Sequence, residues 1–416
     1  MTKEMKRNAR LLHAGGVYNT ARKGYHGNSL VIEGGRILAA GNFEDLRKQY
    51  PAADIDNLKD HYLLPGLINT HVHLEFEALP NTLDFYLAED PYANFLRAAR
   101  HAQIMLKSGV TTLRDAGSSW RLLSLNDPGL KDTMQLPRMQ LAGPPLTVTG
   151  GHCHFFGCEA DSEDELVKSV RFHHKKGCSA LKLMASGGQL TPFSLPERES
   201  YSTALLAAAV QEARRLGMPT FAHCLTTSSM VNALRAGVES IEHAACFVRN
   251  QGNKLLSRVY EEKIMEEFRG DGRWFMNGIS NHYHVLDRAR ENRAVATEKE
   301  LFLLEQEERE CQIFGKYIEL GFRPTIGTDA GTGITYFDET WLECAILAER
   351  CGMDPADIIQ AATVNGAQCL GLAGETGKLE AGLSADIIAL KEDPLKNIRA
   401  LKNPVKVICR GEDVVS

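Results

Sequence analysis

Residues 63–76 read LLPGLINTHVHLEF, an apolar run that ends in two histidines, His71 and His73. Successive side chains of a β-strand point to opposite faces, so histidines two residues apart lie on the same face. Two imidazoles in this arrangement can bind one metal ion. The pair is equally consistent with two ordinary polar residues at the end of a strand.

Seven further apolar runs follow along the 416-residue chain, and helical patterns lie between them. Four helical patterns stop at a glycine, which is typical of helix C-termini. Strands that alternate with helices predict βαβ units and a parallel sheet, and a count of eight predicts a closed (β/α)8 barrel of the TIM type. A doubly wound open sheet is the competing α/β fold. The strand candidates span residues 63–73, 109–117, 138–147, 179–188, 218–224, 239–244, 273–280 and 323–330, and the four helical patterns span 92–109, 162–177, 202–217 and 228–237.

The two ends of the chain differ in character from its middle. SLVIEGGRILAAG (29–41) and PVKVICRGEDVV (404–415) are short β-like runs with glycine turns. We therefore predict a small β-sandwich domain formed from residues 1–65 and 376–416, beside a catalytic barrel over residues 66–375. The hydrophobic fraction of 44% is enough to form a large core.

The composition narrows the class of protein further. A formal net charge of -6, from 47 basic and 53 acidic residues, gives no reason to expect nucleic acid or a membrane surface as a partner. The N-terminal segment lacks the apolar core of a signal peptide, and no run approaches the roughly 20 apolar residues of a membrane span. The ten cysteines include no CxxC pair, which predicts reduced thiols in a cytoplasmic protein.

Five of the strand candidates end in side chains that can bind metal ions or protons. Each side chain alone has an ordinary explanation, because a lone aspartate is often a cap and a lone histidine is often structural. All of them lie at the strand ends where barrel enzymes build their active sites, so together they predict one site. The set consists of His71, His73, Lys182, His223, His243 and Asp329.

These motifs resemble the amidohydrolase superfamily, in the part that includes imidazolonepropionase-like hydrolases and Xaa-Pro and Xaa-Arg dipeptidases. The resemblance covers nearly the whole chain, which makes it far more specific than the two histidines alone. Besides LLPGLINTHVH and GVTTLRDAG, it rests on TGGHCHFFGCEAD (149–161), LKLMASGGQLTP (181–192), AGVESIEHA (236–244), IGTDAG (326–331), TVNGAQCLGL (363–372) and TGKLEAGLSADIIAL (376–390).

The resemblance implies two divalent metal ions, with zinc the first expectation, in the mouth of the barrel. His71, His73 and Asp329 would hold one ion, and His223 and His243 would hold the other. Lys182 would be carboxylated by carbon dioxide and bridge both ions, because a free ammonium has only donors and a carbamate supplies two ligand oxygens. The alternative for Lys182 is an ordinary strand-end lysine that faces solvent or pairs with a carboxylate.

The implied reaction is hydrolysis of an amide-like C–N bond in a small molecule. A metal-bridging hydroxide would attack the carbonyl carbon, and Asp329 would pass a proton to the leaving nitrogen. Amides, ureas, carbamates, N-acyl amino acids and dipeptides all remain open as substrates. Relatives in this superfamily often form oligomers, so a homo-oligomer is also expected.

Residues outside the ligand set bear on the substrate. A histidine from the third loop faces the substrate in resembling enzymes, which indicates His152 first and His154 second, although either can simply pack in its loop. Related dipeptidases carry a tyrosine where this chain has Leu225, and this difference weakens the dipeptidase alternative. His282 or His284 can add to the pocket or belong to a charged helix start, and Arg114 and Asp115 can pair beneath the site.

Two further alternatives are less favoured. Deaminases of the superfamily lack the bridging lysine and carry a glutamate shortly after the fifth-strand histidine, whereas CLTTSS follows His223 here. A non-catalytic scaffold would be expected to have lost several ligands, and this chain keeps all six.

Overall fold

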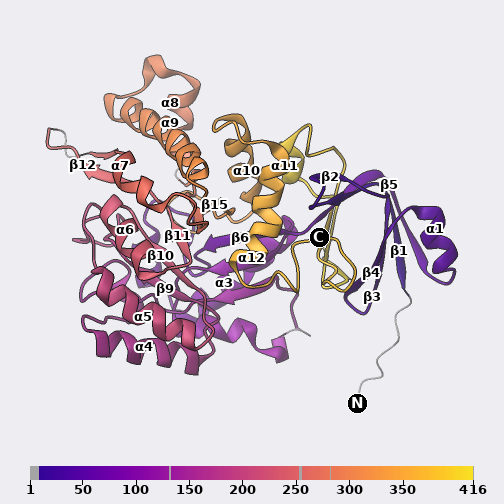
Figure 1. The fold of residues 1–416 in the computed structure, drawn as a ribbon, viewed down its shortest axis with the longest axis horizontal. Helices are drawn as coiled ribbons and strands as arrows, with labels where there is room; N and C mark the ends of the chain where they lie inside the picture. Colours follow the sequence, from indigo (N-terminus) through magenta and orange to yellow (C-terminus); the bar gives the residue numbers. More distant parts are fainter. Residues whose placement is uncertain (1–8, 131–132, 253–254, 282, 416) are drawn as a thin grey trace.

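The structure is a computed structural model that describes residues 9–130, 133–252, 255–281 and 283–415. Figure 1 shows a strand-rich part built from the two ends of the chain, next to a larger part in which strands alternate with helices. Among the described residues, no helix has both the length and the apolar character needed to cross a membrane.

The strands of the two chain ends lie in one eight-stranded sheet. Its order is β18-β17-β16-β5-β1-β3-β4, and β2 pairs with β1. All eight belong to one hydrogen-bonded sheet, so the predicted sandwich of two sheets is not confirmed, and the predicted domain boundaries stay a prediction. The strands are β1 (Arg10–Asn19), β2 (Gly24–Tyr25), β3 (Ser29–Glu33), β4 (Arg36–Gly41), β5 (Asp54–Pro65), β16 (Ile387–Leu390), β17 (Lys406–Cys409) and β18 (Glu412–Asp413).

The long strand β5 joins the two ends of the chain. It pairs in parallel with β1 and antiparallel with β16, where Ile388 lies opposite Leu64. The helix α1 (Phe43–Gln49) adds Leu46 to a small apolar cluster with Leu11 and Val31 of this sheet. The C-terminal strands thus complete a sheet that the first strands begin.

Each of the eight predicted barrel runs contains a strand, and the paired strands run parallel. They fall in two sheets, β6-β7-β8 and β15-β14-β11-β10-β9, which meet at the isolated bridges Val72↔Ala330 and Leu146↔Leu183. The strands are β6 (Leu67–Val72), β7 (Val110–Asp115), β8 (Arg138–Leu141), β9 (Leu181–Met184), β10 (Thr220–His223), β11 (Ser240–Glu242), β14 (Trp274–Met276) and β15 (Arg323–Pro324).

The predicted closed barrel is therefore not formed as one continuous ladder. At one gap, Pro144 and Pro145 follow β8, and proline has no N–H to donate to a neighbouring strand. At the other gap, Asp329 has φ 60°, which bends the segment after β15 away from strand geometry. The segments still touch through backbone hydrogen bonds, such as His73 N to Ala330 O at 2.8 Å.

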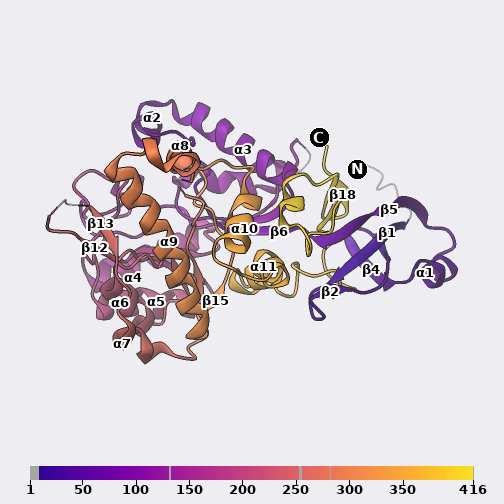
Figure 2. The same ribbon diagram turned by 90° about the horizontal axis from the view of Figure 1, so that it is seen from above.

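The predicted helices are confirmed in position, and their ends carry the expected capping residues. Ser162 forms a capping box with Glu165 at the start of α4, and Gly177 ends that helix in the left-handed conformation. These helices cover the outside of the strands (Figure 2). The four predicted helices are α3 (Pro91–Lys107), α4 (Glu163–Lys176), α5 (Thr203–Arg215) and α6 (Thr227–Ala236), and a further helix is α9 (Glu298–Glu319).

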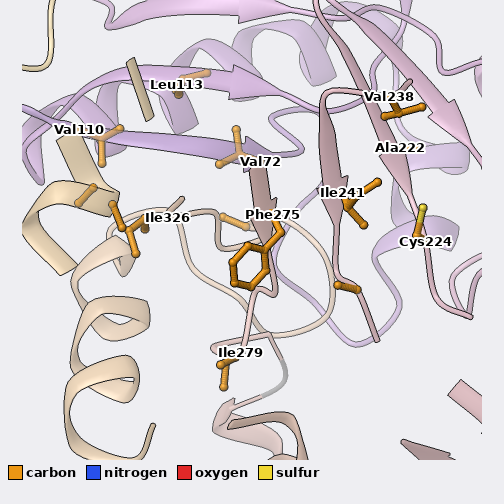
Figure 3. Packing of buried hydrophobic residues seen from close by; sticks show 14 of the residues in the cluster. Val72, Val110, Leu113, Ala222, Cys224, Val238, Ile241, Phe275, Ile279 and Ile326 are labelled. Carbon is orange, nitrogen blue, oxygen red and sulfur yellow. The ribbon is translucent and has the colours of Figure 1, made fainter. Parts of the chain in front are cut away.

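Apolar side chains of the parallel strands pack into one large core. Figure 3 shows Val72, Ile241, Phe275 and Ile326 pointing into this core from different segments. Burial of such side chains contributes about 1.5–3 kcal/mol each, which fixes the positions of the strand ends where the polar residues lie.

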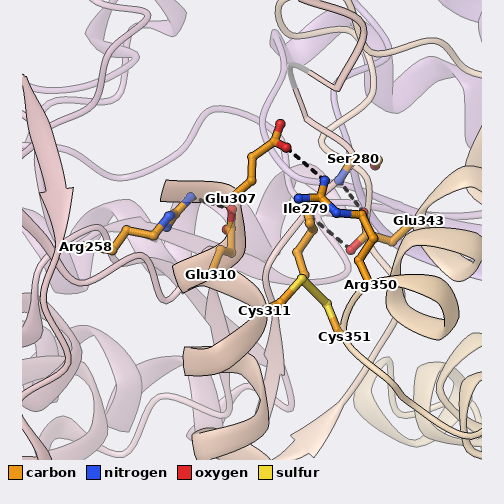
Figure 4. The surroundings of a disulfide bond; sticks show 9 residues. All are labelled: Arg258, Ile279, Ser280, Glu307, Glu310, Cys311, Glu343, Arg350 and Cys351. Carbon is orange, nitrogen blue, oxygen red and sulfur yellow. Dashed lines mark hydrogen bonds and ion pairs between the residues drawn. A yellow bond between two sulfur atoms is a disulfide. The ribbon is translucent and has the colours of Figure 1, made fainter. Parts of the chain in front are cut away.

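One disulfide corrects the prediction that all ten cysteines are reduced. Cys311 of α9 and Cys351, which follows α10 (Thr340–Glu349), are joined with their Cα atoms 4.8 Å apart (Figure 4). The two residues are 40 positions apart, so only the packing of the helices brings them together. No local sequence motif predicts this disulfide. The other eight cysteines are free and buried.

Glu343 lies close to this disulfide and is almost fully buried in the middle of α10. Its carboxylate accepts hydrogen bonds from Ile279 N at 3.1 Å and Ser280 N at 2.7 Å. Burial raises the pKa of Glu343 from 4.5 to about 7, against the lowering effect of these hydrogen bonds.

The raised pKa predicts a specific pH dependence of stability. The contribution of Glu343 is fully present below pH 4.5 and is lost as the pH rises through about 7, because the folded chain binds the proton more tightly than the unfolded chain. Between pH 4.5 and 8, we expect the free energy of unfolding of the wild type to fall by about 3 kcal/mol relative to Glu343→Gln. Denaturant titrations across this range measure the difference. An exposed carboxylate on α9 provides the control, Glu319→Gln, and equal slopes for wild type and Glu343→Gln would contradict the prediction.

Candidate metal centre

The structure brings together three of the predicted ligand residues. His71 and His73 lie at the end of β6, and Asp329 lies in the segment that follows β15. All three are buried, and one ligand atom of each lies within 4.8 Å of the others. The two histidines therefore lie close together on one strand face, as their spacing predicts.

The hydrogen bonds of the two histidines determine which ring nitrogen faces the group. His71 Nδ1 donates to Glu242 Oε2 at 2.5 Å, and His73 Nδ1 donates to Gly117 O at 3.0 Å. In the neutral form of each ring, the lone pair is then on Nε2. These two Nε2 atoms lie 3.5 and 3.3 Å from Asp329 Oδ1.

Three hydrogen-bond acceptors thus converge with no donor between them. His71 Nε2 and Asp329 Oδ1 are buried, and neither has a hydrogen-bond partner among the described residues. Burial alone would raise the pKa of Asp329, but the imidazoles of His73, His243 and His71 around it outweigh burial and hold that pKa well below its usual value. Two imidazole nitrogens and a carboxylate oxygen suit zinc and similar divalent ions, so the residues fit a metal ion.

Glu242 supports this group by accepting the hydrogen bond from His71. The sequence did not predict this role. Burial raises its pKa, but the charge of Arg114 and the hydrogen bond from His71 outweigh burial and lower it. Arg114 Nη2 donates to Glu242 Oε1 at 2.9 Å, so the predicted pairing of Arg114 with Asp115 is wrong. Adjacent residues of a strand point to opposite faces, and Asp115 instead accepts from Leu74 N at 2.9 Å.

The remaining predicted ligands lie beside the first group. The ring centroids of His71 and His243 are 5.0 Å apart, and those of His243 and His223 are 4.7 Å apart. His223 Nε2 donates to Gly187 O at 3.0 Å, which leaves Nδ1 as the unprotonated nitrogen. Burial lowers the pKa of His243 to about 4.

Lys182 lies in the same interior, at the middle of β9. Its side chain is 1% exposed, and Nζ lies 5.0 Å from the ring centroid of Phe221, its register neighbour on β10. Burial lowers the pKa of Lys182 to about 8. The alternative of a strand-end lysine that reaches solvent is thereby wrong.

Three residues in or next to the site have a strained backbone. His243 and Asp329 have φ values of 68° and 60°, and Cys153, next to His152, has 58°. Non-glycine residues adopt this left-handed region rarely, at a cost of about 1–3 kcal/mol each, and such residues cluster at functional sites. The strain is an additional sign, invisible in the sequence, that these loops are built for function.

The three residues predicted to contact the substrate, His152, His154 and Leu225, differ in their burial and in their contacts. His152 is buried, with its ring centroid 4.7 Å from that of His223 and its Nδ1 3.0 Å from Thr191 Oγ1. Burial lowers the pKa of His152 to about 3. His154 is half-buried in the short helix His154–Phe156, and its ring contacts Phe155. Leu225 is buried, and its backbone N donates to Ser186 Oγ at 3.0 Å.

Gly188 lies directly against the His152 ring, where a Cβ atom would meet ring atoms at 2.4–2.5 Å. We expect Gly188→Ala to displace His152 and to lower kcat/KM by about 100-fold, because misplacement by about 1 Å can have an effect of this size. Steady-state kinetics measure it. Gly315 has open space around it and provides the control, Gly315→Ala. A Gly188→Ala variant as active as this control would show that the position of His152 is unimportant.

Other candidates lie outside the ligand group. His284 is bound between Asp287, at 3.0 Å, and Glu339, at 2.8 Å, and starts the charged helical segment as predicted. His282 lies outside the described residues. A cavity of about 550 Å³ at the opposite ends of the strands, near Pro219 and Trp274, contains none of the predicted site residues.

Comparison with known proteins agrees with this architecture. The family described as "Amidohydrolase family" matches residues 62–414, and an "Imidazolonepropionase-like composite domain, bacteria" matches residues 30–53. The chain is 26% identical to ochratoxinase of Aspergillus niger over 412 residues, which cover 91% of this chain and 80% of that protein.

Solved structures show the same fold over nearly the full length. A Xaa-Pro dipeptidase with bound methionine in its active site superposes with a TM-score of 0.82 at 26% identity, covering 98% of this chain and 99% of that one. The crystal structure of A. niger ochratoxinase gives a TM-score of 0.79 at 25% identity, covering 98% and 95%.

Proposed function

Since the chain belongs to the Amidohydrolase family, we propose that it is a binuclear metal-dependent hydrolase of amide-type C–N bonds. The observation that supports metal dependence best is the convergence of His71, His73 and Asp329 as three acceptors with no donor between them. Such an arrangement of lone pairs is unfavourable unless a cation lies among them.

We assign the six residues to two adjacent metal positions. His71, His73 and Asp329 would hold one divalent ion, zinc being the first expectation, and His223 and His243 would hold the other. Lys182, as a carbamate, would supply ligand oxygens to both positions, and the burial that lowers its pKa to about 8 supports this assignment, because carbon dioxide reacts with the neutral amine. When bound, the ions polarise a carbonyl oxygen and lower the pKa of water.

The side chains then carry out the proton transfers and the binding of substrate. Asp329 is the carboxylate at the centre of the group, so it accepts a proton from the attacking water and delivers it to the leaving nitrogen. His152 lies next to His223, and burial keeps its ring neutral. It therefore binds the substrate by donating a hydrogen bond and not through a positive charge. His154 is a more distant contact with the same substrate.

The substrate is most consistent with an amide or N-acyl amino acid. A relative that is named ochratoxinase and the structure of a Xaa-Pro dipeptidase are similar over nearly the whole chain, which favours amide cleavage over deamination. A Xaa-Pro or Xaa-Arg dipeptidase is the second candidate, but the buried Leu225 offers no polar group to a substrate carboxylate. Cytoplasmic location and a homo-oligomer stay predictions.

A hydrolysis screen tests the proposal. The chain would be purified with divalent metal and bicarbonate, its metal content measured, and its activity assayed on dipeptides, N-acyl amino acids, ochratoxin, aryl ureas, carbamates and anilides. We expect two metal ions per chain and turnover of amides that a chelator abolishes. Turnover that persists after complete metal removal would overturn the proposal, as would a chain that binds no metal ion when it is purified with divalent metal and bicarbonate.

A further inference from the structure

We infer that Asn281 is a positioning residue for Asp329, and that Glu343 of α10 holds the loop from which Asn281 acts. The inference rests on the proposed function, because it concerns the orientation of a proposed metal ligand. Neither Asn281 nor Glu343 belongs to the ligand group, and the two residues come from segments before and after β15.

The two oxygens of Asp329 have different environments. Oδ1 faces the Nε2 atoms of His71 and His73, whereas Oδ2 accepts a hydrogen bond from Asn281 Nδ2 at 2.7 Å. This bond prevents the carboxylate from rotating and exchanging its oxygens. It therefore selects which oxygen is presented to the histidines.

The orientation of the Asn281 amide is itself fixed by two threonines. Its Oδ1 accepts from Thr335 Oγ1 at 3.3 Å, and its Nδ2 also donates to Thr332 Oγ1 at 3.2 Å. Thr332 uses its hydroxyl hydrogen to bond Asp329 O at 2.8 Å, so it can only accept from Asn281. The amide nitrogen is thus the atom that faces Asp329.

Glu343 holds the backbone immediately before Asn281. Its two carboxylate oxygens accept from the successive backbone N–H groups of Ile279 and Ser280, as Figure 4 shows. Gly278 turns the chain with φ 67°, and Asn281 N bonds back to Gly278 O at 2.9 Å. A buried side chain in the middle of a helix thereby anchors a loop that would otherwise carry Asn281 loosely.

The contacts predict what is lost when the amide is removed. In Asn281→Ala, Asp329 Oδ2 loses its donor, and the carboxylate can turn between orientations with either oxygen toward the histidines. We expect kcat to fall about 10- to 100-fold with KM changed less than about threefold, because the loss affects the reacting group and not substrate binding. We also expect a chelator to remove metal at least about tenfold faster.

Asn232→Ala is a matched control. The Asn232 amide likewise binds a threonine hydroxyl, Thr203 at 2.8 Å, and donates to a carbonyl, Tyr201 at 3.1 Å, but it lies on α6 away from the ligand group. Its kcat and metal retention should stay within about twofold of wild type. Glu343→Gln, which can accept only one of the two N–H groups, should show the Asn281→Ala effect in weaker form.

The experiment compares metal loss to EDTA, kcat, KM and thermal unfolding for these variants. Faster metal loss in Asn281→Ala than in Asn232→Ala, at similar melting temperature, supports the inference even where no tested amide is turned over. Equal metal retention and equal kcat in the two variants would overturn the inference while leaving the proposed function intact. A wild-type chain that binds no divalent metal would overturn both.

Discussion

Asp329→Asn is expected to lower kcat/KM by about a thousandfold or more. The substitution removes the carboxylate that we propose as the proton acceptor, and loss of such a group alone has an effect of about 10²- to 10⁴-fold. It also replaces a hydrogen-bond acceptor with a donor next to His71 and His73. Asn281 donates to the Oδ2 position, so the new amide would place its oxygen there and turn its NH2 toward His71 and His73.

An NH2 group in that position could bond the two imidazole lone pairs and occupy the place of a cation. We therefore expect the metal content of Asp329→Asn to fall along with its activity. Elemental analysis and steady-state kinetics on the same preparation measure both. Asp386→Asn is the control, because Asp386 is an equally buried aspartate that binds Arg138 and Thr376 in the terminal sheet region. A fully active Asp329→Asn would remove this residue from the mechanism.

Lys182→Ala is expected to reduce activity by a similar factor and to leave fewer than two metal ions per chain. A buried lysine among ligand residues repels cations as an ammonium, offers a single lone pair as a neutral amine, or offers two oxygens as a carbamate. Only the carbamate can supply a ligand oxygen to each of two ions. Lys182→Arg keeps the positive charge and cannot form the same carbamate, so it should lose metal as Lys182→Ala does.

A short carboxylate provides the sharper test of the carbamate. Lys182→Ala leaves a space in the interior that acetate or propionate could enter as an oxygen ligand. We expect either anion to restore part of the metal content and activity of Lys182→Ala but not of Lys182→Arg, whose side chain still fills the space. Two ions and full turnover in Lys182→Arg would exclude the carbamate.

The sequence predicted the features that depend on local pattern. The four helical stretches carry their own capping residues, such as Ser162 and Gly177, and the structure has helices there. The strands lie inside the predicted runs because apolar and β-branched residues are concentrated in them. The gaps between the two sheets were not predictable, since a short run such as 138–147 does not show that pairing ends before Pro144.

The convergence of His71, His73 and Asp329 was predictable for a related reason. His71 and His73 share one strand face by local geometry, and Asp329 follows another strand at the same end. Glu242 and Asn281 were missed because their partners are far away in sequence, and a glutamate or asparagine near a loop has no distinctive pattern. The disulfide was missed for the same reason, since the pairing of Cys311 with Cys351 depends on how two helices pack.

The sheet built from both chain ends has a consequence for synthesis of the protein. β1, β3, β4 and β5 are available once residue 65 has been made, but the β5 edge that faces β16 stays unpaired until residues 66–386 have followed. An open edge of a long strand can pair with other chains. We therefore expect the nascent polypeptide to be prone to aggregation throughout this interval, and a chaperone that shields the β5 edge to raise the yield of native protein.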